Sequence, residues 1–528
     1  MKQLEEEFGM DRAIEIETDD EDDEAERVCH ENEDDNESDI TGISRVPSHD
    51  FMDPDLAPSW PQSYRQSMDM YTSVTPSVSF IRDSSFLIQT EKKSQAPDIE
   101  SSLSKPFLLS VTNSDREIVP TSIPPLALSS ISLFGASMPQ QCSYAQSLLN
   151  ATNALCGIGI LSTPFALKEG GWIGILLLFL FGTIACYTGI LLKRCLESSS
   201  QLQTYPDIGQ AAFGLGGRIC IAVLLYTELY SSCVEFLIMM SDNLSAAFPN
   251  AQVNIIGIHL DSYQTCAIVA TLVILPTVWL RNLSLLSYVS ICGVVTLALV
   301  VLCLVWVGVV SDIGFNPNGK ALNFSHLPIT IGIYSFCYGG HSVFPNIYSS
   351  MENPSRFPSV LTISFMISGL LYASVAVLGF LMFGDATKPQ FTLNLPTRLI
   401  ASKIAGWVVV VAPLTKFGLA MTPVALAIEE LLPVDQLASH TMPIIIRTSL
   451  VVSTLVVALA VPYFGSMMAL IGSLLIMLMS LVLPCACYMR IESERLTKFQ
   501  ITICSIIMGV GVCCAAIGTY SAVASMGT

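Results

Sequence analysis

Two apolar segments of the chain carry glycine, proline and polar residues in their middle. The first reads SLLNATNALCGIGILSTPFAL over residues 147–167, and the second reads YSFCYGGHSVFPNIY over residues 334–348. Glycine stabilises a helix poorly and proline removes a backbone donor, so we expect both segments to unwind midway. Unwound backbone inside a membrane is tolerated only where it faces protein, water or a ligand. The pair therefore predicts a binding site.

A packing role is the alternative explanation for these glycines, since small residues let membrane helices approach closely. A single interrupted segment is compatible with either explanation. Here the two segments occupy corresponding places, because each opens a group of five apolar stretches, and each has polar residues beside its glycines. Matched interruptions of this kind favour a transport site over packing.

The two unwound segments offer groups of opposite polarity. The half-helix that follows Gly157 and Gly159 would present free N–H groups and a partial positive charge to a carboxylate. Free carbonyls between Ser335 and Tyr338 would accept hydrogen bonds from an ammonium group. A zwitterionic amino acid satisfies both ends.

Lys416 lies near the middle of the apolar stretch 404–428. About twelve residues, or about 18 Å at 1.5 Å per residue, separate it from either end, whereas its side chain reaches only about 6 Å. It therefore needs a partner, a cavity or a neutral amine. One interpretation is a structural ion pair with Glu228. The other is an ammonium group in the place of a coupling cation, which favours coupling to protons over coupling to sodium.

Three further ionisable residues fall inside apolar stretches. Glu228 and Glu235 lie seven residues apart, on one helical face with Ser231 and Ser232, and this polar stripe should face the protein interior. His341 is the histidine of the predicted spans, and imidazole titrates near neutral pH. Capping or packing is the alternative for His341, and a structural role is the alternative for Glu235. Lys416, Glu228 and His341 are the candidates for coupling.

The elements that hold these residues follow from composition. The chain has 528 residues, of which 52% are hydrophobic and 13% charged, and its mean hydropathy is +0.57. A soluble fold cannot bury that much apolar surface, so the composition predicts an all-α polytopic membrane protein. About eleven transmembrane helices are expected within a domain at 141–528, at residues 144–167, 171–194, 217–241, 262–281, 286–310, 326–350, 358–382, 404–428, 444–463, 465–489 and 499–523.

Residues 1–140 differ from the rest of the chain in charge. Residues 1–40 alone hold 19 acidic residues against Lys2, Arg12 and Arg27, and they account for most of the net charge of −19. We expect a disordered acidic N-terminal tail in the cytosol, which is mainly solvated. The alternative is that its acidic run is a binding surface for cytosolic partners or a sorting signal, and that Ser38, Ser84 or Ser85 is phosphorylated.

Basic residues near the span ends give the orientation. The side with more of them is expected to be cytosolic, which places the N-terminus in the cytosol and the C-terminus on the other side. The cytosolic side has Lys193, Arg194, Arg218, Arg281, Arg356, Arg447, Arg490, Arg495 and Lys498, and the other side has Lys168, Lys320, Lys388, Arg398 and Lys403. Glycosylation sequons at Asn243 and Asn323 then fall on the non-cytosolic side, where they could be used.

Four stretches resemble the amino acid/auxin permease family, and most closely its plant and fungal vacuolar transporters related to the vesicular GABA transporter. They read NATNALCGIGILSTPFALKEGGW (150–172), TYPDIGQAAFG (204–214), YGGHSVFPNIYSSMENPSRFP (338–358) and PLTKFGLAMTPVALAIEELLP (413–433). The resemblance covers the chain from about residue 140 onward. It implies a LeuT-like five-plus-five inverted repeat, a substrate held between the first and sixth spans, coupling to protons, and a vacuolar membrane with an acidic lumen.

The resemblance also implies roles for individual residues. The carboxylate side is expected at Asn153, Gly157, Ile158 and Gly159, and the amine side at Ser335, Tyr338 and Gly339. Lys416 matches the position that faces the cation site in sodium-coupled relatives. Glu228 and His341 rest on the physical reasoning above and not on the resemblance.

The sequence thus predicts a proton-coupled secondary transporter of amino acids that works by alternating access around two discontinuous helices in the lipid bilayer. The alternative is a luminal amino-acid sensor that signals through its cytosolic tail. We expect no enzyme, because no loop is long enough for a catalytic domain. We also expect no cofactor, no metal and no nucleic-acid partner.

Overall fold

The computed structural model describes residues 60, 61, 64, 68 and 142–527, apart from residues 256–257, 280–282, 316–318 and 433–440; the side chains of Ile255, Ile258, residues 283–294 and Thr415 are also outside the described set. The chain divides into two compact units, Met1–Ala57 and Pro58–Thr528, and every described residue belongs to the second. The disorder predicted for residues 1–140 therefore lies outside the described residues, except at residues 60, 61, 64 and 68.

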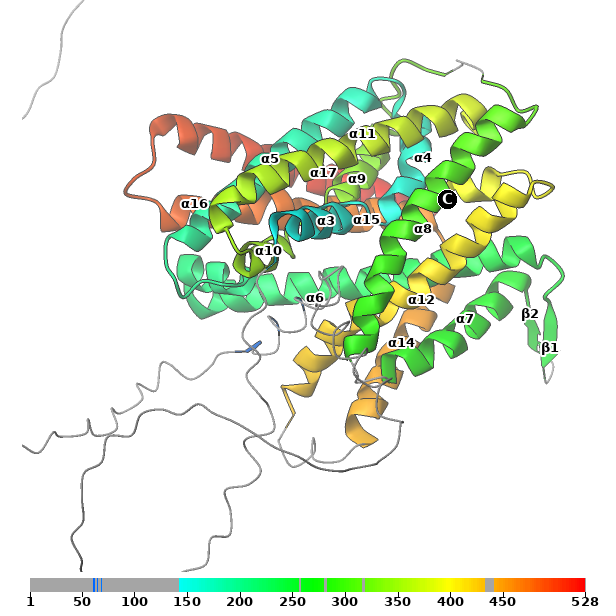
Figure 1. Ribbon diagram of the computed structural model, residues 1–528, viewed down its shortest axis with the longest axis horizontal. Coiled ribbons are helices and arrows are strands. Elements are labelled where there is room, and N and C mark those ends of the chain that lie inside the picture. The colour runs from blue at the N-terminus through cyan, green and yellow to red at the C-terminus, as the bar shows by residue number, and fades with distance from the viewer. Residues whose placement is uncertain are drawn as a thin grey trace, which may run out of the picture. The chain divides into compact units, whose positions relative to one another are not determined.

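Helices dominate the described residues (Figure 1). In chain order the helical elements are α3 (Tyr144–Leu155), η2 (Ile158–Ser162), α4 (Thr163–Gly170), α5 (Gly174–Glu197), α6 (Tyr205–Ala247), α7 (Ser262–Trp279), α8 (Leu283–Val310), α9 (Leu327–Cys337), α10 (Phe344–Ser350), η3 (Pro354–Arg356), α11 (Phe357–Phe383), η4 (Gly384–Ala386), η5 (Phe391–Asn394), α12 (Ile400–Glu429), α14 (Thr441–Ala460), α15 (Phe464–Ile471), η6 (Gly472–Ile476), η7 (Leu478–Val482), α16 (Leu483–Ile491) and α17 (Lys498–Met526). One antiparallel hairpin, β1 (Val253–Ile255) with β2 (Ile258–Leu260), joins α6 to α7.

Several of these helices begin at sequence signals that cap the first turn. In α3, α6 and α17 a hydroxyl side chain accepts a hydrogen bond from the third residue of the helix, whose own side chain accepts one from the capping residue. This reciprocal pattern satisfies two donors that a helix start otherwise leaves free. The capping pairs are Ser143 with Gln146, Thr204 with Asp207, and Thr497 with Gln500.

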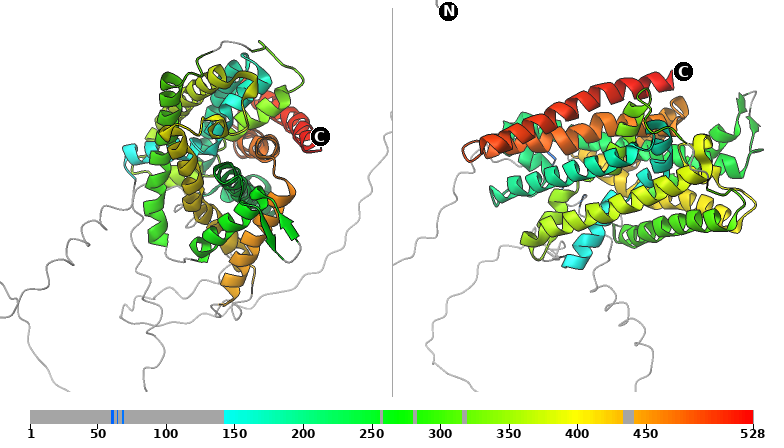
Figure 2. Two further views of the ribbon diagram at one scale, coloured as in Figure 1. Left: turned by 90° about the vertical axis from the view of Figure 1, so that its right-hand side faces the viewer. Right: turned by 90° about the horizontal axis from the view of Figure 1, so that it is seen from above.

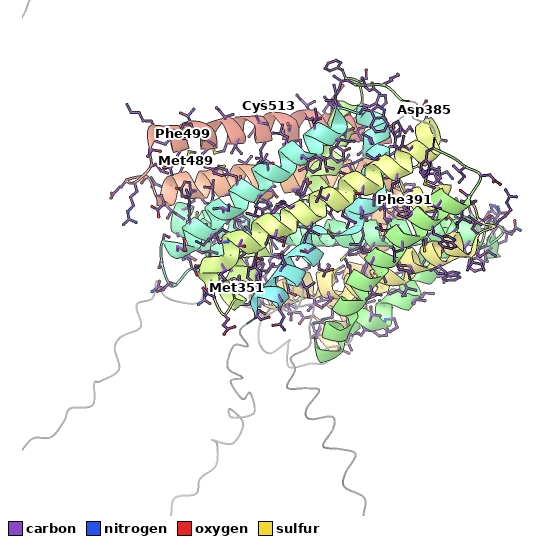
Figure 3. All side chains as sticks on the ribbon, turned by 45° about the horizontal axis from the view of Figure 1, so that its top comes forward. Met351, Asp385, Phe391, Met489, Phe499 and Cys513 are labelled. Carbon is purple, nitrogen blue, oxygen red and sulfur yellow. The ribbon has the colours of Figure 1, made fainter. Side chains whose placement is uncertain are left out.

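The helices expose apolar surface on their outward faces. Phe499 is 73% exposed, Ile400 76% and Trp306 61%, and Figure 3 shows Phe499 and Cys513 along α17. Exposure of this kind over many helices indicates contact with lipid. Among the described residues, eight helical runs are long and apolar enough to cross a membrane, and Val295–Val310 and Leu327–Cys337 are shorter apolar helices. The protein is a predominantly helical, multi-pass membrane protein, and its eleven crossings stay a prediction.

Two groups of five helical segments follow each other along the chain. The broken segment α3–η2–α4 precedes α5, α6, α7 and α8; the broken segment α9–α10 precedes α11, α12, α14 and the run from α15 to α16. The long helices run roughly parallel in the right-hand view of Figure 2. Figure 3 shows Met351, just before α11, and Asp385, just after it, at opposite ends of the helices.

The two broken segments run in opposite directions. The start of the first lies beside the end of the second, because the Cys142 N–H donates to the Ser350 carbonyl at 2.7 Å. The end of the first lies beside the start of the second, because Thr330 Oγ1 donates to the Ala166 carbonyl at 2.9 Å. This antiparallel pairing is the arrangement expected for an inverted repeat of the LeuT-like type.

Helix α6 continues beyond the end at residue 241 that hydropathy predicted. Its last turns hold Asn243, which is buried, and whose amide donates to Gln390 Oε1 at 2.6 Å and to the Met239 carbonyl at 2.9 Å. The prediction that the sequon at Asn243 could carry a glycan is therefore wrong for this fold. The hydropathy signal stopped early because the polar residues here bond to one another and not to water.

Candidate functional site

The first predicted break is confirmed. Helix α3 ends at Leu155, Gly157 is extended with φ −88° and ψ −156°, and a 3₁₀ turn begins at Ile158. The N–H groups of Ile158 and Gly159 are the first of that turn and have no acceptor within it. A Cβ atom added to Gly157 would meet no other atom within 4 Å, so this residue borders open space.

The second predicted break is confirmed as well. Helix α9 ends at Cys337 and α10 begins at Phe344, with Pro345 in its first turn. The expectation of free carbonyls at this break is wrong. The Ser335 carbonyl accepts from the Tyr338 N–H at 3.1 Å, Phe336 from Gly339 at 3.1 Å, and Tyr338 from Gly340 at 3.0 Å. The chain satisfies its own carbonyls by turning tightly.

One tyrosine joins the ends of the two breaks. The Tyr372 hydroxyl of α11 lies within hydrogen-bond reach of the Leu155 carbonyl and of the Cys337 carbonyl, the latter at 3.1 Å. These carbonyls belong to the last residues of α3 and α9. Since a phenol carries a single proton, the two carbonyls share one donor. Tyr372 thus fixes the separation of the two helix ends.

Tyr372 completes a polar stripe on α11. Ser364 Oγ accepts from Thr152 Oγ1 at 3.2 Å, and Ser368 Oγ lies 3.1 Å from Cys156 Sγ. The spacing of four residues places all three α11 side chains on one helical face, toward α3. Our sequence reasoning missed this stripe. The spacing of Ser364, Ser368 and Tyr372 within the apolar stretch 358–382 was the signal that could have found it.

A cavity of about 90 Å³ lies between the two breaks. Water needs about 10–15 Å³ on this scale, so the cavity can take several waters or a small solute. Its walls come from both breaks, α6, α12 and η6; they are Asn150, Asn153, Ala154, Leu155, Gly157, Ile158, Gly159, Glu228, Leu229, Ser232, Phe236, Phe336, Cys337, Gly339, Ser342, Val343, Lys416, Leu419 and Ile476.

Seven of the ten predicted site residues border this cavity. They are Asn153, Gly157, Ile158, Gly159, Gly339, Glu228 and Lys416. Ser335, Tyr338 and His341 do not. Tyr338 instead stacks on Phe365 at 5.7 Å and borders a separate apolar hollow. Ser335 is buried, and its hydroxyl has no partner among the described residues.

His341 lies behind the second break. Its ring is buried, and Nε2 lies 3.0 Å from Thr188 Oγ1 and 3.0 Å from the Ala185 carbonyl, both of α5. The ring also packs on Phe344. These contacts match the packing alternative for this residue.

Glu228 connects α6 to the second break. Its Oε1 accepts from Ser342 Oγ at 3.4 Å, and its Oε2 is buried without a partner among the described residues. Glu235 does not border the cavity; it is fully buried, and both of its oxygens lack a described partner. Glu228 is therefore the carboxyl group of α6 that a solute in the cavity can reach.

Lys416 lies beside the first break. It borders the cavity and a second hollow, and Gly157 and Ile158 line both. Within the part of the chain that the structure describes, its ammonium forms no ion pair, so the ion pair with Glu228 is absent. The cavity thus has one amine and one carboxyl group on its walls that are not paired with each other.

The described residues contain no cluster of three metal-ligating side chains. What the arrangement offers is a small enclosure with main-chain N–H donors at one wall, buried acceptor oxygens on Glu228 and Asn153, and the Lys416 amine beside the donors. An enclosure of this size, with donors and acceptors on different walls, has room for a small polar solute.

Comparison with known proteins identifies the family. The model of the family described as "Transmembrane amino acid transporter protein" matches residues 140–524. The chain is 51% identical to amino acid transporter AVT1D of Arabidopsis thaliana over 89% of this chain and 87% of that one, and 47% identical to AVT1B of the same plant over 98% of each. It is 29% identical to the vesicular GABA transporter of Caenorhabditis elegans over 70% of this chain and 78% of that one.

Solved structures of similar chains are more distant. A Na⁺-coupled sialic acid symporter is 10% identical with a TM-score of 0.43, over 71% of this chain and 89% of that one. A manganese transporter of Eremococcus coleocola is 11% identical with a TM-score of 0.43, over 72% and 87%. The family match covers both breaks and every wall of the cavity, so this chain belongs to the transmembrane amino acid transporter family.

Proposed function

We propose that this protein is a proton-coupled secondary transporter that moves a zwitterionic amino acid across the vacuolar membrane by alternating access around its two broken helices. The observation that carries the proposal is the cavity between the breaks, with unpaired donors on one wall and unpaired acceptors on others. A zwitterion needs both kinds of group within a few ångströms.

The carboxylate of the substrate binds at the first break. The N–H groups of Ile158 and Gly159 lie at the start of a turn, where the backbone carries partial positive charge. The ammonium of Lys416 lies beside the same turn and adds to the attraction. Gly157 leaves the approach open because it has no side chain.

The ammonium group of the substrate binds side chains and not the carbonyls of the second break. Those carbonyls already accept bonds from their own turn and from Tyr372. The buried oxygens Glu228 Oε2 and Asn153 Oδ1 have no described partner and border or face the cavity. An ionised carboxyl beside an ammonium is the stronger of the two contacts.

Coupling rests on Lys416 and Glu228. The Lys416 side chain lies beside the first break, and its ammonium takes the place of a coupling sodium ion. The driving ion in this proposal is therefore a proton, which binds to a side chain. Glu228 supplies the proton site, because protonation of its carboxyl removes the charge that holds the substrate ammonium. We assign no coupling role to His341, since Thr188 and the Ala185 carbonyl hold its ring outside the cavity.

The vacuolar location is supported by the resemblance of the four motifs to vacuolar transporters, and an acidic lumen supplies the proton gradient. The N-terminus lies in the cytosol and the C-terminus in the lumen, as the basic residues near the span ends indicate. The sensor alternative depends on the acidic tail, most of which lies outside the described residues.

Uptake into proteoliposomes tests the proposal. Purified protein is supplied with a panel of labelled amino acids under an imposed pH gradient, under a sodium gradient at equal pH, and with the pH gradient collapsed by a protonophore. We expect accumulation of at least one amino acid with the pH gradient alone. Accumulation driven by sodium, or none with any gradient, contradicts the proposal. A fluorescent fusion of the full chain, imaged with a vacuolar membrane marker, tests the location.

A further inference from the structure

Described residues of the predicted tail pack into or against the core of the helical bundle. Tyr64 is 1% exposed and Met68 is 0% exposed, and Trp60 packs against the same apolar cluster. Each of the three residues is four positions from the next, and Tyr64 and Met68 have helical backbone. This spacing allows the three side chains to lie on one helical face. Composition predicted a solvated tail here. Buried aromatic and thioether side chains indicate a docked segment.

The docked residues contact three separate elements. Trp60 Nε1 donates to the Ala427 carbonyl near the end of α12 at 2.9 Å. Arg218 Nε, in the first half of α6, donates to the Trp60 carbonyl at 3.0 Å. The rings of Trp60 and Tyr64 pack on Tyr226 of α6, with centroids 5.6 and 6.2 Å apart.

The third element is the second break itself. The Tyr64 hydroxyl donates to the Ser342 carbonyl at 2.9 Å. Ser342 borders the cavity, and its own hydroxyl donates to Glu228. A single residue thus separates the docked segment from the carboxyl group that faces the cavity.

The contacts lie on the side that the sequence predicts to be cytosolic. Arg218 is one of the basic residues of that side, and α12 ends there. For the cavity to open to the cytosol, α6, α12 and the second break have to separate at this end. Trp60 and Tyr64 hold all three together.

We propose that Trp60, Pro61, Tyr64 and Met68 form a plug that closes the cytosolic mouth of the cavity and inhibits transport until it leaves. The proposal rests on this chain transporting a solute, but not on the coupling ion or the membrane. The plug is suited to reversible release, because the Trp60 and Tyr64 side chains donate to main-chain carbonyls, and Arg218, which donates to the Trp60 carbonyl, also binds Asp207 at 2.6 Å. Departure of the plug therefore leaves Arg218 paired.

The test compares full-length variants in proteoliposomes. The plug variant carries Trp60→Ala, Tyr64→Ala and Met68→Ala, and the matched control carries Tyr71→Ala, an aromatic residue of the same tail that the plug does not include. We expect the plug variant to raise the initial rate of amino-acid transport at least threefold per folded molecule, and the control to equal the parent chain. A rate at or below that of the parent, with the same amount of folded protein by thermal unfolding, overturns the proposal.

A peptide experiment keeps the proposal testable if transport fails or the plug variant folds poorly. A labelled peptide of residues 58–70 is titrated onto the purified Tyr64→Ala chain, and binding is read by fluorescence anisotropy. A tethered segment acts at an effective concentration on the order of 1 mM, so we expect half-saturation below about 1 mM. Peptide supplied on both sides of the vesicle membrane should restore inhibition. The same peptide with Tyr64→Ala should bind at least tenfold more weakly. Equal affinity of the two peptides, or no binding, overturns the plug; absence of transport in every variant bears instead on the proposed function.

Discussion

The two breaks face one cavity but use their backbone differently. At the first, the N–H groups of Ile158 and Gly159 begin a turn without an acceptor inside it, and Gly157 borders open space. At the second, the carbonyls from Ser335 to Tyr338 accept bonds from the same turn or from Tyr372, and a Cβ on Gly339 would come within 2.7 Å of Ile476. In the proposed mechanism, the first break binds the solute through its backbone. The second contributes the side chain that contacts Glu228.

Lys416 gives the largest expected effect, because it is the charged group beside the first break. We expect Lys416→Ala to lower uptake driven by a pH gradient at least tenfold, since the place of the fixed cation is left empty. Exchange of labelled for unlabelled substrate, which needs no net proton movement, should decline far less. Both are measured in proteoliposomes. Lys403→Ala, an exposed lysine of the same helix α12, is the control and should match the parent. Full uptake driven by protons in Lys416→Ala would remove the coupling role.

Gly157 and Gly159 separate binding from packing within the first break. A methyl group on Gly157 meets no atom within 4 Å, and its φ of −88° suits alanine, so Gly157→Ala should fold normally. The methyl group occupies space at the donors, and we expect KM to rise about fivefold, equivalent to about 1 kcal/mol of binding.

Gly159→Ala should instead lower the stability of the fold. Its Cβ would lie 2.9 Å from Cys337 Sγ, and such overpacking costs about 1–3 kcal/mol of stability. Thermal unfolding and substrate titration of the two purified variants make the comparison. An unchanged KM in Gly157→Ala would show that the first break does not contact the substrate.

Tyr372 tests whether the two breaks depend on each other. Tyr372→Phe leaves the Leu155 and Cys337 carbonyls without their shared donor, and an unsatisfied buried polar group costs about 1–3 kcal/mol. We expect a lower thermal unfolding temperature and about threefold slower transport. Tyr334→Phe is the matched control, because the Tyr334 hydroxyl is buried without a partner among the described residues and its removal should be neutral or stabilising. Equal unfolding temperatures for the two variants would mean that the shared donor is unimportant.

Local patterns were enough to predict where the helices break. Glycine and proline act on their own backbone, so Gly157 and Gly339 marked the breaks before any packing was known. Hydropathy likewise located most of the helices. The bonding of the second break could not be predicted, because its acceptors are satisfied partly by Tyr372, a residue 35 positions away from Cys337.

The directions of side chains and the docking of distant residues also could not be predicted from the sequence. Tyr338 follows the end of α9 and points to Phe365 and not to the cavity, which depends on how α11 packs. The docking of Trp60 and Tyr64 joins residues 367 and 278 positions apart. Within an acidic tail, three residues at a spacing of four carry too little signal to outweigh the composition around them.

The smallest effect is expected at the second break, where the side chain of Ser342 is the contact. Its bond to Glu228 is long, at 3.4 Å, and a weak hydrogen bond contributes well under the usual 0.5–1.5 kcal/mol or so. Ser342→Ala should therefore change the substrate KM by about twofold and leave thermal unfolding unchanged. Ser335→Ala, which removes a hydroxyl outside the cavity and without a described partner, should leave both unchanged. If Ser335→Ala weakened binding more than Ser342→Ala, the substrate ammonium would have to lie along α9, as the resemblance implied. The second break, and not the side chains of Glu228 and Asn153, would then bind the ammonium group.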